Sequence, residues 1–175
     1  MQSGDIFGQP DGVMGWFSRN LLSPKNECIH YGLILFYWEA INDWLVLESI
    51  GHKGVHIAAL GDRKVKIYHV VGISDEDRQK AIRESFGLCG AWYDWKLIAK
   101  LILKGTPKLI VKRRRLSAKE LSGGYKQDEQ YICTEAALAG YAKAGIHIVP
   151  KGILPLPSSI KEAELQGKIV RVGRL

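Results

Sequence analysis

The sequence predicts an α+β domain in which an antiparallel sheet packs against helices. Three observations support this class: strand patterns fill the first half, helix start and stop residues follow, and strand patterns return near the end. The chain has 175 residues, 46% of them hydrophobic, which is enough for a core of its own. We therefore expect one domain, residues 1–175.

The strands are predicted from aromatic and branched residues with period-two alternation. A polar turn at residues 40–43 separates two of these runs, so they are expected to pair as antiparallel neighbours. A glycine- and proline-containing loop is expected at residues 8–15. The predicted strands are residues 4–7, 28–38, 44–50, 54–57 and 64–71.

Helices are predicted where capping residues precede helix formers and glycine follows them. Ser74 and Asp77 form a capping-box opening, and Gly105 with Pro107 should end the second helix. The predicted helices are residues 78–86, 94–104 and 133–143. Further strands are expected at residues 109–111, 147–149 and 168–172, with loops around Pro150, Pro155 and Pro157.

A net charge of +7 and a pI of about 9.3 predict attraction to polyanions such as nucleic acid, anionic lipid or an anionic wall polymer. The basic run Lys112, Arg113, Arg114 and Arg115 could bind phosphates or an anionic surface, although a solvated face and loop is the more ordinary interpretation. Longer apolar runs such as 33–38 stop far short of the roughly 20 residues of a spanning helix, so no transmembrane segment is expected.

The N-terminus shows neither a basic region nor an apolar region typical of a secretory signal, which predicts cytoplasmic synthesis and residence. Cys28, Cys89 and Cys133 are odd in number and lack C-x-x-C spacing, as expected for free thiols in a reducing compartment. His52 and His56 have i, i+4 spacing, but Gly54 between them weakens a helix. No metal site and no cofactor are predicted.

Cys133 is the strongest chemical candidate because it falls where an apolar approach turns into an alanine-rich helix. A helix N-terminus favours thiolate over thiol, which is what a nucleophilic cysteine needs. Nearby acids such as Glu135 oppose the thiolate, so a base must help. The alternative is an inert, buried cysteine. Cys28 could share a strand face with His30, but it lacks a helix dipole.

His30 and Glu48 lie in two strands that are predicted to pair, so their side chains can meet on one face. Together they could form a base and its orienting carboxylate for Cys133. Each has an ordinary alternative, a core histidine and a surface acid. Glu48 nevertheless interrupts the apolar run 45–50, and a buried carboxylate needs a partner.

Five short segments match the motifs of a known family, in the same order and over most of the chain. They are Gly4–Phe7, Ile29–Ile34, Val46–Ser49 with Gly54 and Val55, Gly90–Trp95, and Tyr131–Glu135. Through these segments the sequence resembles the permuted papain-like cysteine hydrolases of the NlpC superfamily, in particular their YiiX-like branch. Ile29, Ser49 and Thr134 depart mildly from the family pattern.

The resemblance implies a permuted papain-like fold with Cys133 as nucleophile, His30 as general base and Glu48 as the orienting residue. Tyr93 is similar to a tyrosine that lines the pocket or helps stabilise the oxyanion, with a buried aromatic as its alternative. The aromatic neighbours Trp92 and Trp95 are expected to be core or pocket walls.

The function expected from these residues is hydrolysis of amide bonds through a thioester acyl-enzyme. By analogy with the family, the substrate is a peptide, a peptidoglycan stem peptide or a lipid-like acyl compound. Two alternatives stay open. One is an inactive basic module that docks on nucleic acid or an anionic membrane, and the other is an acyltransferase.

Overall fold

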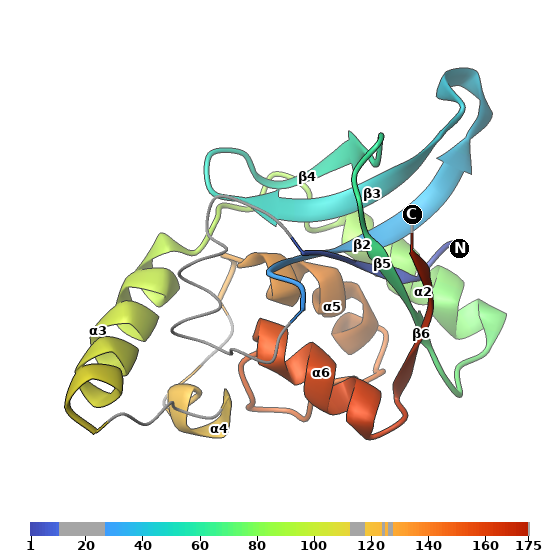
Figure 1. Cartoon of the computed structure of the whole chain (residues 1–175). Coiled ribbons are helices and arrows are strands. Elements are labelled where there is room, and N and C mark those ends of the chain that lie inside the picture. The colour runs from blue at the N-terminus through green and yellow to red at the C-terminus, as the bar shows by residue number, and fades with distance from the viewer. Residues whose placement is uncertain (11–26, 113–117, 124, 126–127, 175) are drawn as a thin grey trace.

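The computed structural model describes residues 1–10, 27–112, 118–123, 125 and 128–174 (Figure 1). Its strands are β1 (Ile6–Gln9), β2 (His30–Trp38), β3 (Asp43–Ile50), β4 (Gly54–Ala59), β5 (Lys66–Val70) and β6 (Ile169–Arg174). Its helices are η2 (Glu39–Ile41), α2 (Asp75–Phe86), α3 (Trp95–Lys112), α4 (Ala118–Leu121), α5 (Cys133–Lys143) and α6 (Pro157–Leu165).

The six described strands form one sheet in the order β4-β3-β2-β1-β5-β6, and all neighbours are antiparallel. The helices α5 and α2 pack together, and α5 lies against β2 and β3 (Figure 1). The predicted α+β class, with an antiparallel sheet packed against helices, is therefore confirmed. Residues 1–175 as one domain stay a prediction.

The core divides between the two faces of the sheet. Side chains of β2 and β3 that point toward α5, such as Leu33 and Leu47, belong to the larger buried cluster. On the opposite face, Phe7, Ile34 and Val46 form a second cluster. Because side chains alternate along a strand, His30 and Glu48 fall on this second face, away from the body of α5.

The first nine residues of α5, Cys133 to Tyr141, are all buried. Apart from Glu135 they are small or apolar, which lets the helix pack closely on several sides. Gly140 marks the closest approach to α2. A Cβ there would lie 1.9 Å from Ser85 Oγ and 2.4 Å from the Ala81 carbonyl oxygen. The absence of a side chain at Gly140 therefore allows α2 and α5 to pack this closely.

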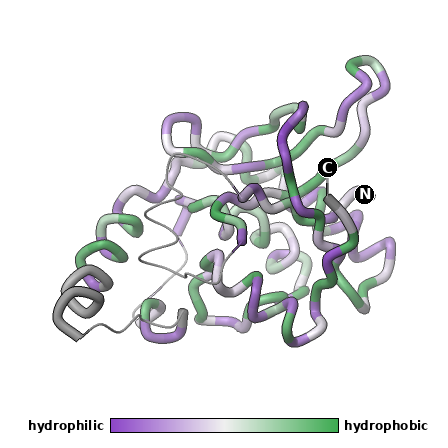
Figure 2. The backbone as a smooth tube through the Cα atoms, viewed as in Figure 1, coloured by the Kyte–Doolittle hydropathy of each residue, from purple (hydrophilic) through white to green (hydrophobic). Residues whose placement is uncertain are grey.

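A separate apolar cluster joins α3 to the approach of α5. Leu101 and Leu121 pack with Ile132, Leu154 and Leu156. Along the described part of α3, hydrophobic and hydrophilic segments alternate with the helical turns (Figure 2), as expected for an amphipathic helix. No described helix is both long and apolar enough to cross a membrane.

The loop predicted at residues 8–15 begins later than expected, because β1 runs to Gln9, and residues 11–15 lie outside the described residues. The structure also corrects three further elements. Helix α3 continues past Gly105 and Pro107, so the predicted strand at 109–111 is wrong. A strand needs a neighbouring strand to bond its backbone N–H and C=O groups. Residues 109–111 have no such neighbour in the described sheet, and their backbone groups belong to α3 instead. The predicted strand at 147–149 is also wrong, because this segment has no ladder and instead offers the carbonyls of His147 and Ile148 to Lys168 Nζ at 3.4 and 3.1 Å.

The third correction is helix α6, which lies where a proline-rich loop was expected. Pro157 occupies the first turn of the helix, where its missing N–H is not needed and its fixed φ is already helical. The predicted helix at 133–143 agrees with α5, and the capping residue Ser74 accepts the Asp77 N–H at 3.1 Å as expected.

Candidate active site

Cys133 is the first residue of α5 and lies at the unpaired N–H groups of that helix. Two hydrogen bonds fix this helix start. Glu135 Oε2 accepts the N–H of the N-cap residue Ile132 at 2.9 Å, and the Tyr131 carbonyl accepts the Ser49 hydroxyl of β3 at 2.7 Å. The candidate nucleophile is thus positioned by its own helix and by β3.

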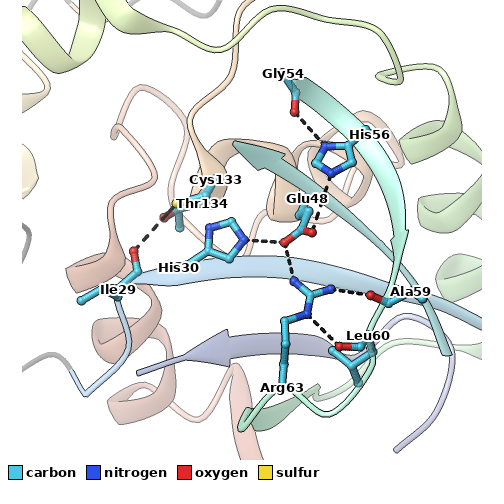
Figure 3. A network of polar contacts seen from close by, with 10 residues as sticks. All are labelled: Ile29, His30, Glu48, Gly54, His56, Ala59, Leu60, Arg63, Cys133 and Thr134. Carbon is cyan, nitrogen blue, oxygen red and sulfur yellow. Dashed lines mark hydrogen bonds and ion pairs between the residues drawn. The ribbon is translucent and has the colours of Figure 1, made fainter. Parts of the chain in front are cut away.

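His30 and Glu48 meet across the β2–β3 pair, as predicted. Glu48 lies directly opposite Gly32, so His30 is its diagonal neighbour on the same face. The distance from His30 Nε2 to Glu48 Oε2 is 2.6 Å, and the two side chains are 18% and 6% exposed. The carboxylate therefore accepts from Nε2 and leaves Nδ1 as the free ring nitrogen (Figure 3).

Gly32 makes room for this pair. A Cβ at Gly32 would lie 2.3 Å from the Phe7 ring and 2.6 Å from the Leu47 carbonyl oxygen. The Phe7 ring instead occupies that space and meets the His30 ring edge to face, with centroids 6.0 Å apart. The Phe7 ring and the Glu48 carboxylate therefore both fix the position of the His30 imidazole.

The His30 ring lies between Cys133 and Glu48 (Figure 3). The Cys133 sulfur is 4.0 Å from the Ile29 carbonyl oxygen and 3.8 Å from Thr134 Oγ1. Burial alone would raise the pKa of the Cys133 thiol, but the hydrogen bond and positive charge of His30 lower it below its ordinary value. The backbone of Tyr31 and the Thr134 hydroxyl act in the same direction.

The pKa of His30 moves the other way. Burial alone would lower it, but hydrogen bonds and charges of Cys133 and Glu48 outweigh burial and raise it to about 9. The lowered pKa of Cys133 and the raised pKa of His30 are consistent, because the thiolate and the imidazolium stabilise each other. The site thus favours a thiolate–imidazolium pair at neutral pH.

Two further side chains, which were not predicted to belong to this site, reach Glu48. Arg63 Nη1 donates to Glu48 Oε2 at 2.8 Å, and His56 Nε2 lies 3.8 Å from Glu48 Oε1 (Figure 3). Burial would raise the pKa of Glu48, but His30 first and Arg63 second lower it to about 2. His56 lies in β4, which covers the strand predicted at residues 54–57, and is directly opposite Glu48. That register was the one available signal for it.

Tyr93 lies close enough to Cys133 for the two to interact electrostatically. Burial raises the pKa of the Tyr93 hydroxyl, and the charges of Cys133, Glu135 and Asp94 raise it further. Its ring packs against Trp95, with centroids 5.0 Å apart. A place beside the site agrees with a pocket residue, and its role in stabilising an oxyanion stays a prediction.

Trp92 and Trp95 were expected to be core or pocket walls; the core alternative is wrong, since 76% and 54% of their surfaces are exposed, and the pocket-wall alternative stays a prediction. Trp95 covers Gly51 and donates from Nε1 to its carbonyl at 3.1 Å, so it is a wall over the β3–β4 turn. The Trp92 carbonyl accepts the Tyr131 N–H at 3.0 Å, two residues before the candidate nucleophile.

The other cysteines are placed differently. Cys28 precedes the first residue of β2 and belongs to the core on the helix side, where its sulfur lies 3.8 Å from Tyr68 Oη. It does not share the face of His30, and burial raises the pKa of its thiol. Cys89 is exposed. Lys112 ends α3, and Arg113, Arg114 and Arg115 lie outside the described residues, so the basic run stays a prediction.

The fold and the three converging side chains define an α+β protein with a Cys–His–Glu constellation where β2 begins, beside the start of α5. Neither a protein-family model nor a curated relative matches the sequence. In fold, the chain is similar to the crystal structure of the metalloprotein YiiX from Escherichia coli O157:H7, with a TM-score of 0.66. The match covers 99% of this chain and 97% of that chain at 16% sequence identity, so it shows a YiiX-like fold.

Proposed function

We propose that the chain is a cysteine hydrolase of amide bonds that acts through Cys133, His30 and Glu48. The observation that carries the proposal is the position of His30 between the other two side chains, with Nε2 bonded to Glu48 at 2.6 Å. Nδ1 then remains for the thiol of Cys133, which is the relation a base needs to its nucleophile. The YiiX-like fold supports a papain-like hydrolase of the NlpC superfamily.

In the proposed first half-reaction, the Cys133 thiolate attacks the carbonyl carbon of the amide. The backbone N–H of Cys133, at the helix start, donates to the developing oxyanion, and Tyr93 is a second candidate donor. The imidazolium of His30 gives its Nδ1 proton to the departing nitrogen. The C–N bond breaks, and a thioester and a free amine result.

In the second half-reaction, His30 takes a proton from water while the hydroxide attacks the thioester. The C–S bond breaks, the carboxylic acid leaves, and the thiolate–imidazolium pair is restored. If an amine or alcohol replaced water at this step, the same site would be an acyltransferase. Peptides and peptidoglycan stem peptides are the proposed substrates, and lipid-like acyl compounds are the next candidates.

YiiX is described as a metalloprotein, so we tested whether this chain's site fits a cation. Across the described residues, no group of three or more His, Cys, Asp or Glu side chains is arranged to hold a metal ion. Near the candidate site, Glu48 faces His30 and His56 but already carries the Arg63 guanidinium at 2.8 Å. The fixed positive charge of Arg63 beside Glu48, the carboxylate that His30 and His56 share, opposes a cation there, and the proposed steps use none.

The test is covalent labelling with an acyl-peptide vinyl sulfone at pH 6, followed by identification of the modified residue by mass spectrometry. The wild type and Cys89→Ala, which removes the exposed cysteine, should be labelled at residue 133. Cys133→Ala and His30→Ala should lose that label. Equal labelling of wild type, Cys133→Ala and His30→Ala would count against a hydrolase.

A further inference from the structure

Arg63 lies in the segment between β4 and β5 and points at the carboxylate that orients His30 (Figure 3). Its Nη1 donates to Glu48 Oε2 at 2.8 Å, the same oxygen that accepts from His30 Nε2 at 2.6 Å. One carboxylate oxygen therefore serves the imidazole and the guanidinium together. The side chain of Arg63 is 24% exposed and that of Glu48 is 6% exposed, so water screens this contact only in part.

The guanidinium is held by every nitrogen it has. Nε donates to the Leu60 carbonyl at 2.8 Å, and Nη2 donates to the Ala59 carbonyl at 2.8 Å. Arg63 also lies over the Phe7 ring, 5.4 Å from its centroid. Because a planar guanidinium has its donors in a fixed fork, these anchors leave one orientation for Nη1.

Phe7 connects the two ends of this arrangement. Its ring meets the His30 ring in a T-shaped arrangement, and the Arg63 guanidinium lies over its face. His30, Glu48, Arg63 and Phe7 thus form a closed ring of four side chains on the face of the sheet away from α5. Such a ring fixes the position of each member more firmly than any one contact could.

Three cationic or basic groups face Glu48: His30 from β2, His56 from β4 and Arg63 from the segment after β4. His56 Nε2 lies 3.8 Å from Glu48 Oε1, so a small rotation of the Glu48 carboxylate would let it bond His56 in place of His30. His56 Nδ1 is meanwhile within 3.1 Å of the Gly54 carbonyl oxygen. Something must keep the carboxylate aimed at His30 instead.

We propose that Arg63 is a positioning residue of the active site, which holds the Glu48 carboxylate aimed at His30 and away from His56. This inference rests on the proposed function, because it gives Arg63 a role only if His30 serves Cys133. Arg63 touches neither the thiol nor the imidazole and acts through Glu48. Lysine cannot replace it fully, since one ammonium cannot bond Glu48 and both carbonyls in this planar geometry.

The experiment compares Arg63→Met, Arg63→Lys and the control Arg83→Met, an exposed arginine of α2. Two quantities are measured on the folded proteins. One is the second-order rate constant for alkylation of Cys133 by iodoacetamide at pH 7. The other is the downfield proton NMR resonance of His30 Nε2–H, which reports the bond to Glu48 without any turnover.

For Arg63→Met we expect the His30 Nε2–H resonance to disappear or to shift markedly upfield. We also expect the alkylation rate to fall about tenfold, which is the lower end of the roughly 10–100-fold loss seen when an outer partner of a functional side chain is removed. Arg63→Lys should recover part of both, and Arg83→Met should match wild type. If Arg63 only anchors its own segment, Arg63→Met would lower the unfolding midpoint but leave rate and resonance unchanged, which would overturn the inference.

The outcomes also separate this inference from the proposed function. A wild-type Cys133 that reacts no faster than the exposed Cys89 would refute the hydrolase proposal. A reactive wild type with an equally reactive Arg63→Met would refute only the role of Arg63. If Arg63→Met does not fold, the same two readouts on Arg63→Lys decide, and wild-type values for both would overturn the inference.

Discussion

His30 Nε2 and Glu48 Oε2 lie 2.6 Å apart although the two residues are not directly opposite in the β2–β3 register. The residue opposite Glu48 is Gly32, which has no side chain to block the diagonal. The short distance therefore depends on a glycine at one position and on the Phe7 ring that fills the space beside it. Charge, geometry and packing at this pair are linked, and each can be tested separately.

Replacing Glu48 with glutamine keeps the shape of the side chain and removes its charge. The pKa of His30, raised to about 9 by Cys133 and Glu48, should fall toward 6.5. Cys133 still raises the pKa of His30 in this variant, so the imidazolium only becomes less populated at neutral pH, but the imidazole also loses its orienting carboxylate. Turnover should drop by roughly 10²-fold or more. The measurement is an NMR titration of His30 beside the rate of thioester formation. Glu39→Gln at an exposed acid is the control, and a pKa that stays near 9 in Glu48→Gln would contradict the account.

Replacing Gly32 with alanine should destabilise the fold. The new Cβ would meet the Phe7 ring at 2.3 Å and the Leu47 carbonyl oxygen at 2.6 Å. Forcing an extra carbon into a packed core costs about 1–3 kcal/mol. Urea denaturation measures this cost. The matched control is Gly87→Ala, where φ is −66° and the nearest atom is 3.5 Å from the new Cβ. Equal midpoints for both variants would show that the Phe7 packing is unimportant.

Glu135 makes stability depend on pH. Its burial, with added repulsion from Asp94 and Asp128, raises its pKa to about 7 despite hydrogen bonds from Tyr125 and Ile132. The native state then holds the proton more tightly than the unfolded chain. The stability it contributes is fully present below pH 4.5 and is lost as pH rises through about 7.

Glu135→Gln should remove most of this dependence, because the amide has no proton to lose. Urea midpoints at pH 5 and pH 8 should differ in the wild type and differ less in the variant. The control Glu76→Gln replaces an exposed acid, so its urea midpoints at pH 5 and pH 8 should differ as much as in the wild type. A Glu135→Gln protein with the full wild-type difference would assign the pH dependence to other groups.

The sequence was sufficient for the parts of the site that rest on local pattern. Cys133 could be placed at a helix start because alanines and Gly145 define that helix locally, and His30 could be placed beside Glu48 because two adjacent strands pair across a short turn. Arg63 could not be found this way. Its position depends on the backbone between β4 and β5 and on carbonyls that carry no sequence signal.

The errors in secondary structure have a common cause. Proline and glycine were given too much weight as breakers at Pro107 and Pro157, although the first lies within α3 and the second lies in the first turn of α6. Cys28 was predicted to share a strand face with His30, but the alternation of side chains along a strand does not apply to it, because β2 begins only at His30. In each case, tertiary context decided what a local pattern could not.

The pH dependence of Cys133 alkylation tests the central claim most directly, since it reports the thiolate that His30 stabilises. The rate constant for iodoacetamide, measured from pH 4 to 10 by mass spectrometry at residue 133, should rise in wild type with a midpoint clearly below the ordinary thiol value of 9.0. In His30→Ala the midpoint should rise to about 9.0 or above, because burial then loses its main opposing group and only the hydrogen bonds of the Tyr31 backbone and Thr134 still lower the pKa of Cys133. A midpoint near 9.0 in both proteins would contradict the thiolate–imidazolium pair and with it the proposed hydrolase.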